Sequence, residues 1–226
     1  MNLPQYKIDL IELMVRSGVL LFGDFTTKSG RQSPYFVNTG YYKTGTQANK
    51  LSEYYAALIN DKLKGQFDAL FGPAYKGIPL CTLTAAALWR NHQIETNYCF
   101  NRKEAKDHGE GGIIVGYQPQ TGDRLLITED VISAGTAVRE VMPLIKHLGA
   151  TVTDMVISVN RMEKGYDGLT ASEEIQRDFG ITVHSIVTVY DILAYLHNRE
   201  IDGKVYITDE LKSRMESYIE QYCIAL

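Results

Sequence analysis

One segment in the middle of the chain constrains the fold most: an apolar run, two adjacent acids, a turn of small residues and a helix-forming stretch. Residues 124–128 are predicted to form a buried strand, and Glu129 and Asp130 follow it directly. Residues 133–136 are small, and residues 136–148 have the apolar spacing of a helix. A strand that passes through a tight turn into a helix is the unit from which parallel α/β sheets are built.

The small-residue turn predicts an anion site. Backbone N–H groups at a helix start point to one spot, where the helix dipole adds positive potential. Gly135 lets the backbone come close to a ligand, and Ser133 and Thr136 add hydroxyl donors. Glu129 and Asp130 would repel a phosphate but can accept hydrogen bonds from neutral hydroxyls. Ribose 5-phosphate therefore fits both halves of the segment. The alternative is a helix-capping loop with surface acids; a Walker A loop is excluded, because no Gly-Lys-Ser/Thr follows.

The rest of the chain alternates between predicted strands and helices. This pattern indicates one α/β domain over residues 1–226, with a mostly parallel sheet flanked by helices on both faces. The predicted strands are 68–71, 95–100, 113–116, 124–128, 151–160 and 184–189. The predicted helices are 3–16, 47–63, 77–91, 136–148, one that begins at a capping box of Thr170 and Glu173, 191–197 and 209–222. The turn-rich β region at 20–37 predicts a small N-terminal hood subdomain, formed mainly by about residues 1–40.

Composition excludes several classes of protein. The formal net charge of −4 argues against a general nucleic-acid binder, which is usually basic. No apolar run approaches the ~20 residues that a membrane helix needs, and the first 18 residues do not resemble a signal peptide. We therefore expect a cytoplasmic protein that binds neither nucleic acid nor membrane. Cys81, Cys99 and Cys223 lack metal-ligand spacing and are predicted to be buried free thiols.

Two further segments carry cations at predicted strand ends. Residues 25–36 form a basic turn, with Lys28 and Arg31, that leads into an aromatic strand. Residues 71–79 combine a strand end, a turn and a helix start with Lys76, an arrangement that suits a second anion such as pyrophosphate. Either segment alone could be an ordinary surface turn or a helix cap.

A third segment, residues 101–112, is too hydrophilic for the core. Three cations, a histidine and three glycines lie within these twelve residues. This composition predicts a mobile loop that can fold over a polyanion, although a solvated polar loop would have a similar composition.

Residues 125–137 resemble the ribose-phosphate-binding signature of type I phosphoribosyltransferases. Taken with the other three segments, they make the chain similar to the orotate phosphoribosyltransferases, over about residues 20–161 and more weakly beyond. The Lys-Glu-Ala-Lys-Asp-His-Gly-Glu run at 103–110 discriminates best. The resemblance implies the type I phosphoribosyltransferase fold. It also implies transfer of ribose 5-phosphate from phosphoribosyl pyrophosphate (PRPP) to orotate, giving orotidine 5′-monophosphate and pyrophosphate in pyrimidine biosynthesis.

The resemblance also implies roles for individual residues. Those expected to contact PRPP are Lys28, Tyr75, Lys76, Arg102, Lys103, Lys106, His108, Glu129, Asp130, Val131, Ile132, Ser133, Ala134, Gly135, Thr136 and Ala137. Those expected to contact orotate are Lys28, Phe36, Val37, Ser133 and Arg161. Those expected to carry catalysis are Lys76, Arg102, Lys106, His108 and Asp130. Val37 stands where many family members have a second aromatic residue, which would loosen stacking on the base.

Cofactor and partners follow from the same resemblance. Mg²⁺ is expected to arrive with PRPP, without a dedicated protein metal site. A homodimer is expected, with the 102–112 loop shared across the interface. Two alternatives remain open: a phosphoribosyltransferase for another base, and a regulator of the same fold that senses PRPP.

Overall fold

The central sheet of the computed structural model is mostly parallel, as predicted. The structure describes residues 3–27, 29–106, 112–132, 135–165 and 167–225. Within them the sheet runs in the order β5 (Gly112–Gly116), β4 (Asn97–Lys106), β3 (Ala69–Gly72), β6 (Arg124–Thr128), β7 (Thr151–Asn160) and β8 (Thr182–Thr188). Neighbouring strands are parallel except β5, which is antiparallel to β4.

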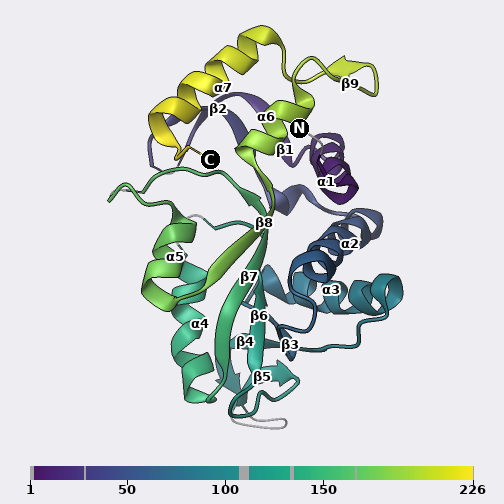
Figure 1. Ribbon diagram of the computed structural model, residues 1–226, viewed down its shortest axis with the longest axis vertical. Coiled ribbons are helices and arrows are strands. Elements are labelled where there is room, and N and C mark those ends of the chain that lie inside the picture. The colour runs from purple at the N-terminus through teal and green to yellow at the C-terminus, as the bar shows by residue number, and fades with distance from the viewer. Residues whose placement is uncertain (1–2, 28, 107–111, 133–134, 166, 226) are drawn as a thin grey trace.

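Helices cover both faces of this sheet (Figure 1). One face carries α1 (Gln5–Arg16), α2 (Gly45–Lys62) and α3 (Gly77–His92); the other carries α4 (Thr136–His147) and α5 (Ala171–Phe179). Side chains of β6 alternate between the two cores, since Leu126 packs toward the first face and Leu125 and Ile127 toward the second. Because both faces of the sheet are covered at its centre, the central strands β3 and β6 are short, buried, mainly apolar runs.

A smaller layer lies above the carboxyl end of the sheet (Figure 1). Its β1 (Leu20–Thr26) and β2 (Gln32–Val37) form an antiparallel pair, followed by the short helix η1 (Thr39–Tyr41). Beside them lie C-terminal elements: α6 (Val189–Leu196), β9 (Glu200–Ile201), β10 (Lys204–Val205) and α7 (Asp209–Tyr222). The rings of Tyr35 on β2 and Tyr218 on α7 pack edge to face, with centroids 6.0 Å apart. Both ends of the chain therefore build the hood, which the sequence assigned mainly to residues 1–40.

The prediction of a loop over residues 101–112 is wrong for the first half of this segment. Strand β4 continues to Lys106 and pairs with β5, with Asn101 opposite Ile114 and Lys106 opposite Gly112. Residues 107–111 lie outside the described part. Polarity did not reveal this strand because the hairpin lies at the sheet edge, where strand side chains face solvent.

Several local predictions are confirmed. Thr170 and Glu173 form the predicted capping box at the start of α5. All three cysteines are buried and free. Among the helices that the structure describes, none combines the length and the apolar character needed to cross a membrane. The β9–β10 hairpin was not predicted, because each of its strands has only two residues.

Candidate active site

A crevice opens where the strand order of the sheet reverses. After β3 the chain crosses through α3 to β4 on one side, and after β6 it crosses through α4 to β7 on the other side. The ends of β3 and β6 therefore stand side by side with their following loops diverging, which is where open α/β sheets bind ligands. A cavity of about 230 Å³ lies here, lined by Ala74, Tyr75, Lys76, Glu129, Asp130, Val131, Ile132, Gly135, Thr136, Ala137 and Val138.

Asp130 is the centre of this cavity's polar contacts. The Nζ of Lys76 lies 2.7 Å from Oδ2 of Asp130 and 3.2 Å from Oγ1 of Thr39. The Thr39 hydroxyl donates to the same carboxylate oxygen, and the backbone N–H of Val131 donates to Oδ1 at 2.8 Å. Burial alone would raise the pKa of Asp130, but the hydrogen bonds from Lys76 and Thr39 outweigh it and lower that pKa below its ordinary value. Asp130 is therefore an ionised acceptor.

Glu129, the adjacent residue, has the opposite character. Burial raises the pKa of its carboxyl to about 8, although the backbone N–H of Asp130 donates to Oε1 at 3.0 Å. Burial therefore favours the protonated form of this side chain, and in that form it can donate a hydrogen bond. Two neighbouring acids thus offer a donor and an acceptor to the same cavity.

The backbone of the acidic pair is fixed from two sides. The buried Tyr55 of α2 donates its hydroxyl to the carbonyl of Glu129 at 2.7 Å. Ser158 of β7 donates to the carbonyl of Asp130 twice, from Oγ at 2.6 Å and from the backbone N–H at 2.9 Å. Such anchoring reduces the reorganisation that a bound ligand would otherwise require.

Glycines bring the two loops together. A Cβ on Gly77, at the start of α3, would lie 2.9 Å from the carbonyl oxygen of Thr128, so only glycine lets this helix approach the end of β6. Gly135 precedes α4 in the left-handed region at φ 64°, where a Cβ would lie 2.7 Å from Cδ1 of Ile175. The first turn of α4 has backbone N–H groups without intrahelical partners beside this cavity, as an anion site requires.

The structure thus places nine of the residues predicted to contact PRPP around one cavity. They are Tyr75, Lys76, Glu129, Asp130, Val131, Ile132, Gly135, Thr136 and Ala137. Lys28, His108, Ser133 and Ala134 lie outside the described residues, and the side chain of Lys106 is not described.

The described cations of the β4–β5 hairpin contact other groups. The Nζ of Lys103 lies 2.8 Å from Oε2 of Glu140 on α4, and this hydrogen bond raises the pKa of Lys103. Arg102 donates from Nη1 to the carbonyl of Gly112 at 3.1 Å. A ligand in the cavity would have to draw these side chains away from their present partners.

The predicted base-binding residues lie in and below the hood. Phe36 of β2 stacks on Phe25 with ring centroids 5.4 Å apart, and Val37 packs against the core of the first face. Arg161 follows β7, and its guanidinium lies 4.4 Å from the centre of the Tyr35 ring. Its Nε and Nη2 donate to Oε1 of Glu163 at 2.8 and 2.5 Å.

Sequence reasoning missed the partners that hold the predicted residues in place. Thr39 contacts Asp130, and Asn101 accepts from the backbone N–H of Ala74 at 2.9 Å, which holds the loop after β3. Glu163 contacts Arg161. Thr39 and Asn101 are polar residues distant in sequence from their partners, so no local pattern identifies them.

Known proteins are similar to this chain in sequence and in fold. The family model of the phosphoribosyl transferase domain matches residues 39–189, which include the crevice but not β1 and β2. An orotate phosphoribosyltransferase of Clostridium beijerinckii is 48% identical over 218 residues, covering 96% of this chain and 97% of that protein. That of Colwellia psychrerythraea is 46% identical over 220 residues, covering 97% of each chain. This chain belongs to the orotate phosphoribosyltransferase family.

A solved structure extends the family likeness to the whole architecture. The crystal structure of the orotate phosphoribosyltransferase of Francisella tularensis superposes with a TM-score of 0.83 at 35% identity, covering 96% of this chain and all of that one. The predicted type I phosphoribosyltransferase fold is thereby confirmed. Because the full-length relatives also cover the hood, the likeness includes the segment expected to carry base specificity.

Proposed function

We propose that this chain transfers the ribose 5-phosphate of PRPP to a ring nitrogen of orotate, in pyrimidine biosynthesis. The observation that carries the proposal is the crevice itself: the ionised Asp130, paired with Lys76 and Thr39, stands beside the N-terminus of α4. The proposal is also supported by sequence, because the chain is 48% identical to an orotate phosphoribosyltransferase over 96% of its own length.

The sugar phosphate fits the crevice in one orientation. The 5-phosphate takes the N-terminus of α4, where backbone N–H groups and the helix dipole favour an anion. The ribose hydroxyls then face Glu129 and Asp130, of which Asp130 accepts hydrogen bonds and Glu129 can donate one. The pyrophosphate at C1 extends toward the loop of Tyr75 and Lys76.

During the reaction the bond from C1 to pyrophosphate breaks while the bond from C1 to the ring nitrogen of orotate forms. Negative charge grows on the departing pyrophosphate. Lys76 is placed to stabilise it, and we propose that Arg102, Lys103, Lys106 and His108 of the β4–β5 hairpin join it. Lys103 must first break its ion pair with Glu140. That pair is exposed, and exposed ion pairs contribute little to stability.

Mg²⁺ is proposed to bind together with PRPP. Among the described residues, no three His, Cys, Asp or Glu side chains are grouped so that they could hold a metal. The crevice offers two acidic side chains, of which burial favours the protonated form of Glu129, and Oδ2 of Asp130 already contacts Lys76 and Thr39. This donor set fits an ion held mainly by substrate oxygens and water. When bound, Mg²⁺ neutralises part of the charge of the diphosphate.

Orotate is proposed to lie between the crevice and the hood, against Phe36 and Val37. Arg161 would take its carboxylate, since a guanidinium matches a carboxylate in a planar pair of hydrogen bonds. Lys28 and Ser133 are the other proposed contacts. The proposed homodimer shares the 102–112 hairpin between subunits, and in this chain Arg102 and Lys103 contact groups other than the crevice. The protein is proposed to act in the cytoplasm.

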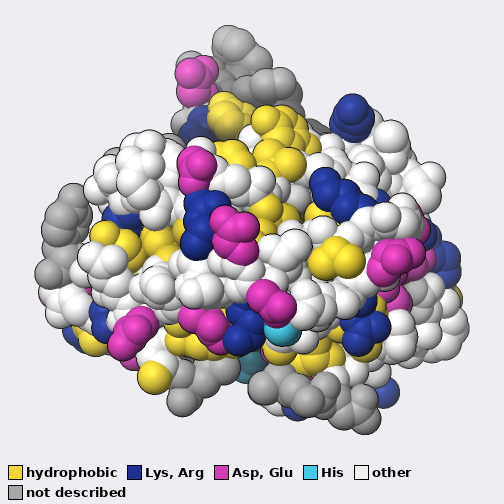
Figure 2. Space-filling model, turned by 90° about the horizontal axis from the view of Figure 1, so that it is seen from above, with side chains coloured by type: hydrophobic (Ala, Val, Ile, Leu, Met, Phe, Trp, Pro, Cys, Tyr) yellow, Lys and Arg dark blue, Asp and Glu magenta, His cyan; other side chains and the backbone are white. Residues whose placement is uncertain are grey.

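A panel of bases tests the proposal against its alternatives. With PRPP and Mg²⁺ present, we expect orotate to be consumed at least about a hundredfold faster than uracil, adenine, guanine or hypoxanthine, because only orotate pairs with Arg161. Faster turnover of another base would reassign the enzyme. A regulator that binds nucleic acid would instead need a basic surface. On the face shown in Figure 2, Lys and Arg side chains stand among Asp and Glu side chains.

A further inference from the structure

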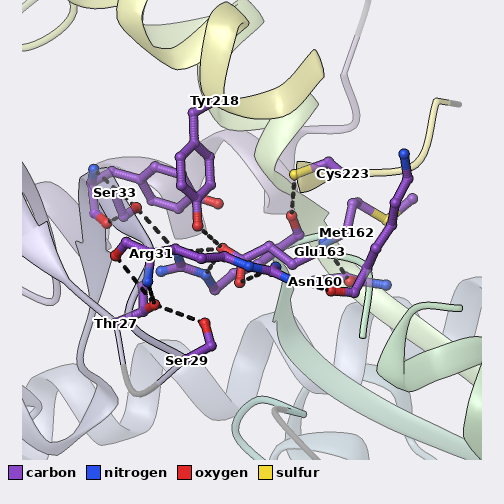
Figure 3. A network of polar contacts seen from close by, with 12 residues as sticks. Thr27, Ser29, Arg31, Ser33, Asn160, Met162, Glu163, Tyr218 and Cys223 are labelled. Atoms are coloured by element: carbon purple, nitrogen blue, oxygen red, sulfur yellow. Dashed lines mark hydrogen bonds and ion pairs between the residues drawn. The ribbon is translucent and has the colours of Figure 1, made fainter. Parts of the chain in front are cut away.

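Glu163 is the residue on which the contacts around Arg161 converge (Figure 3). Its Oε1 accepts three hydrogen bonds: from Nε of Arg161 at 2.8 Å, from Nη2 of Arg161 at 2.5 Å and from the hydroxyl of Tyr218 at 2.8 Å. Its Oε2 lies 3.9 Å from Nη1 of Arg31. Three side chains therefore hold Glu163: Arg31 from the turn before β2, Tyr218 from α7 and Arg161 from the same loop.

The backbone of Glu163 is fixed as well. It forms a bridge with Cys223, and on either side of it Lys164 donates to the carbonyl of Tyr222 at 2.8 Å and Ile224 donates to the carbonyl of Met162 at 3.0 Å. The C-terminal segment after α7 therefore pairs with the segment that carries Arg161. This pairing fixes the backbone from which the Glu163 side chain extends.

The guanidinium of Arg161 is only partly used by these contacts. Glu163 occupies the edge formed by Nε and Nη2, and Ser33 Oγ lies 3.2 Å from Nη2. Among the described residues, none accepts a hydrogen bond from Nη1. The ring of Tyr35 covers one flat side of the group. Nη1 is therefore the nitrogen from which a ligand carboxylate can accept a hydrogen bond without displacing Glu163.

The sheet register places the backbone of Arg161 near the crevice. Val159 of β7 bridges Val131, the residue after Asp130, in parallel. Arg161 is two residues beyond Val159, and so it follows the sheet edge at the level of the turn that binds the 5-phosphate.

We propose that Glu163 is a positioning residue: held by Tyr218, Arg31 and the C-terminal segment, it orients Arg161 so that Nη1 receives the carboxylate of the base. The inference rests on the proposed function. It assigns a role to the C-terminal part of the chain, which lies beyond the part that the family model matches.

The test is the KM for orotate in Glu163→Ala, Glu163→Gln and Tyr218→Phe. Misplacing a binding group by about 1 Å costs on the order of a hundredfold. We therefore expect Glu163→Ala to raise the KM for orotate about tenfold to a hundredfold, with the KM for PRPP unchanged. Glu163→Gln keeps an acceptor oxygen and should recover most of the loss. Tyr218→Phe, which removes one contact to Glu163, should raise the KM for orotate severalfold.

Glu12 and Tyr195 provide the matched control. Glu12 also accepts from an arginine, Arg16, and from a tyrosine hydroxyl, that of Tyr195 at 2.6 Å, but it lies on α1. Glu12→Ala and Tyr195→Phe should leave the KM for orotate unchanged.

A double variant separates positioning from general loss of structure. In an Arg161→Ala background, adding Glu163→Ala should not raise the KM for orotate further, because the effect passes through Arg161. An unchanged KM in folded Glu163→Ala and Tyr218→Phe would overturn the proposal. A lowered KM would also overturn it, since Glu163 would then compete with the substrate carboxylate. If the unaltered chain consumed no orotate, the proposed function itself would fail.

Discussion

At the scale of single residues, the crevice shows how two adjacent acids acquire different chemistry. Glu129 and Asp130 are equally buried, each 7% exposed. The carboxylate of Asp130 accepts hydrogen bonds from the ammonium group of Lys76 and the hydroxyl of Thr39. The carboxyl of Glu129 accepts one, from a backbone N–H. The pKa of Asp130 is therefore lowered and that of Glu129 is raised. Sequence alone predicted both as hydroxyl acceptors and did not distinguish them.

Replacing Lys76 tests the role of its charge. Lys76→Ala should lower kcat/KM for PRPP by about 10²–10³, by analogy with the loss of about 3–4 kcal/mol when one preorganised donor is removed. The contact that lowers the pKa of Asp130 is also lost, so burial should raise that pKa and move the acid limb of the pH–rate profile to higher pH.

The control for Lys76 is Lys62→Ala, which removes a surface lysine that pairs with Asp61. It should leave both the rate and the pH profile unchanged. An acid limb that stays in place in active Lys76→Ala would show that Lys76 does not govern the ionisation of Asp130.

Replacing Glu129 tests the raised pKa through stability. The folded state holds a proton that the unfolded state releases between the ordinary pKa of 4.5 and about 8, so this group makes folding less favourable as pH rises through that window. Glu129→Gln keeps the acceptor for the N–H of Asp130 and cannot ionise. At pH 8 the free energy of unfolding of Glu129→Gln should exceed that of the unaltered chain by about 2–4 kcal/mol. At pH 4.5 the two values should differ little.

Urea denaturation at several pH values measures this difference, with the surface substitution Glu216→Gln as the control. A difference between Glu129→Gln and the unaltered chain that does not change with pH would contradict the raised pKa.

At the scale of elements, the turn between β6 and α4 depends on its glycine. Gly135 has a left-handed backbone and a close neighbour in Ile175, whereas Gly180 after α5 has a similar φ of 72° and nothing within 4 Å of a Cβ. Gly180→Ala should therefore cost only the strain of that backbone, about 1–2 kcal/mol. Gly135→Ala adds the clash with Ile175 to the same strain.

We therefore expect Gly135→Ala to unfold more easily than Gly180→Ala and, unlike it, to weaken PRPP binding at least tenfold. Thermal unfolding and isothermal titration with PRPP measure the two effects. Equal PRPP affinity in the two variants would show that the backbone at Gly135 does not shape the phosphate site.

How far sequence predicts each element depends on where its partners lie. The strand before the acidic pair and the helix that follows the small-residue turn were placed correctly, because these elements are contiguous in sequence. The strand from Asn101 to Lys106 was taken as a loop because a polar edge hairpin has no apolar pattern. Thr39 was missed because its partner Asp130 is 91 positions away, and only the packed fold brings them together.

At the scale of the whole molecule, the two ends of the chain meet in the hood. The N-terminal β1–β2 pair packs against α7 (Figure 1). The C-terminal segment pairs with the loop of Arg161. The part matched by the family model contains the crevice, and the parts outside it complete the layer above it. We therefore expect specificity for the base to depend on both termini, and binding of the sugar phosphate to depend on the sheet.

The proposed sharing of the 102–112 hairpin is tested by mixing two inactive variants, Lys106→Ala and Asp130→Asn. If the hairpin crosses the dimer interface, each mixed dimer has one site with both changes and one site with neither. An equal mixture that exchanges freely should then regain about one quarter of the activity of the unaltered protein. No regain, with exchange shown by pull-down of differently tagged subunits, would place each hairpin over its own site.

The most direct measurement of the central claim is the balance of the reaction itself. With PRPP and Mg²⁺ present, the purified chain should consume orotate and release pyrophosphate in equal amounts. Leaving out PRPP should stop the reaction, and Asp130→Asn should slow it by orders of magnitude. Absence of orotate consumption by the folded, unaltered chain, at any enzyme concentration, would contradict the account.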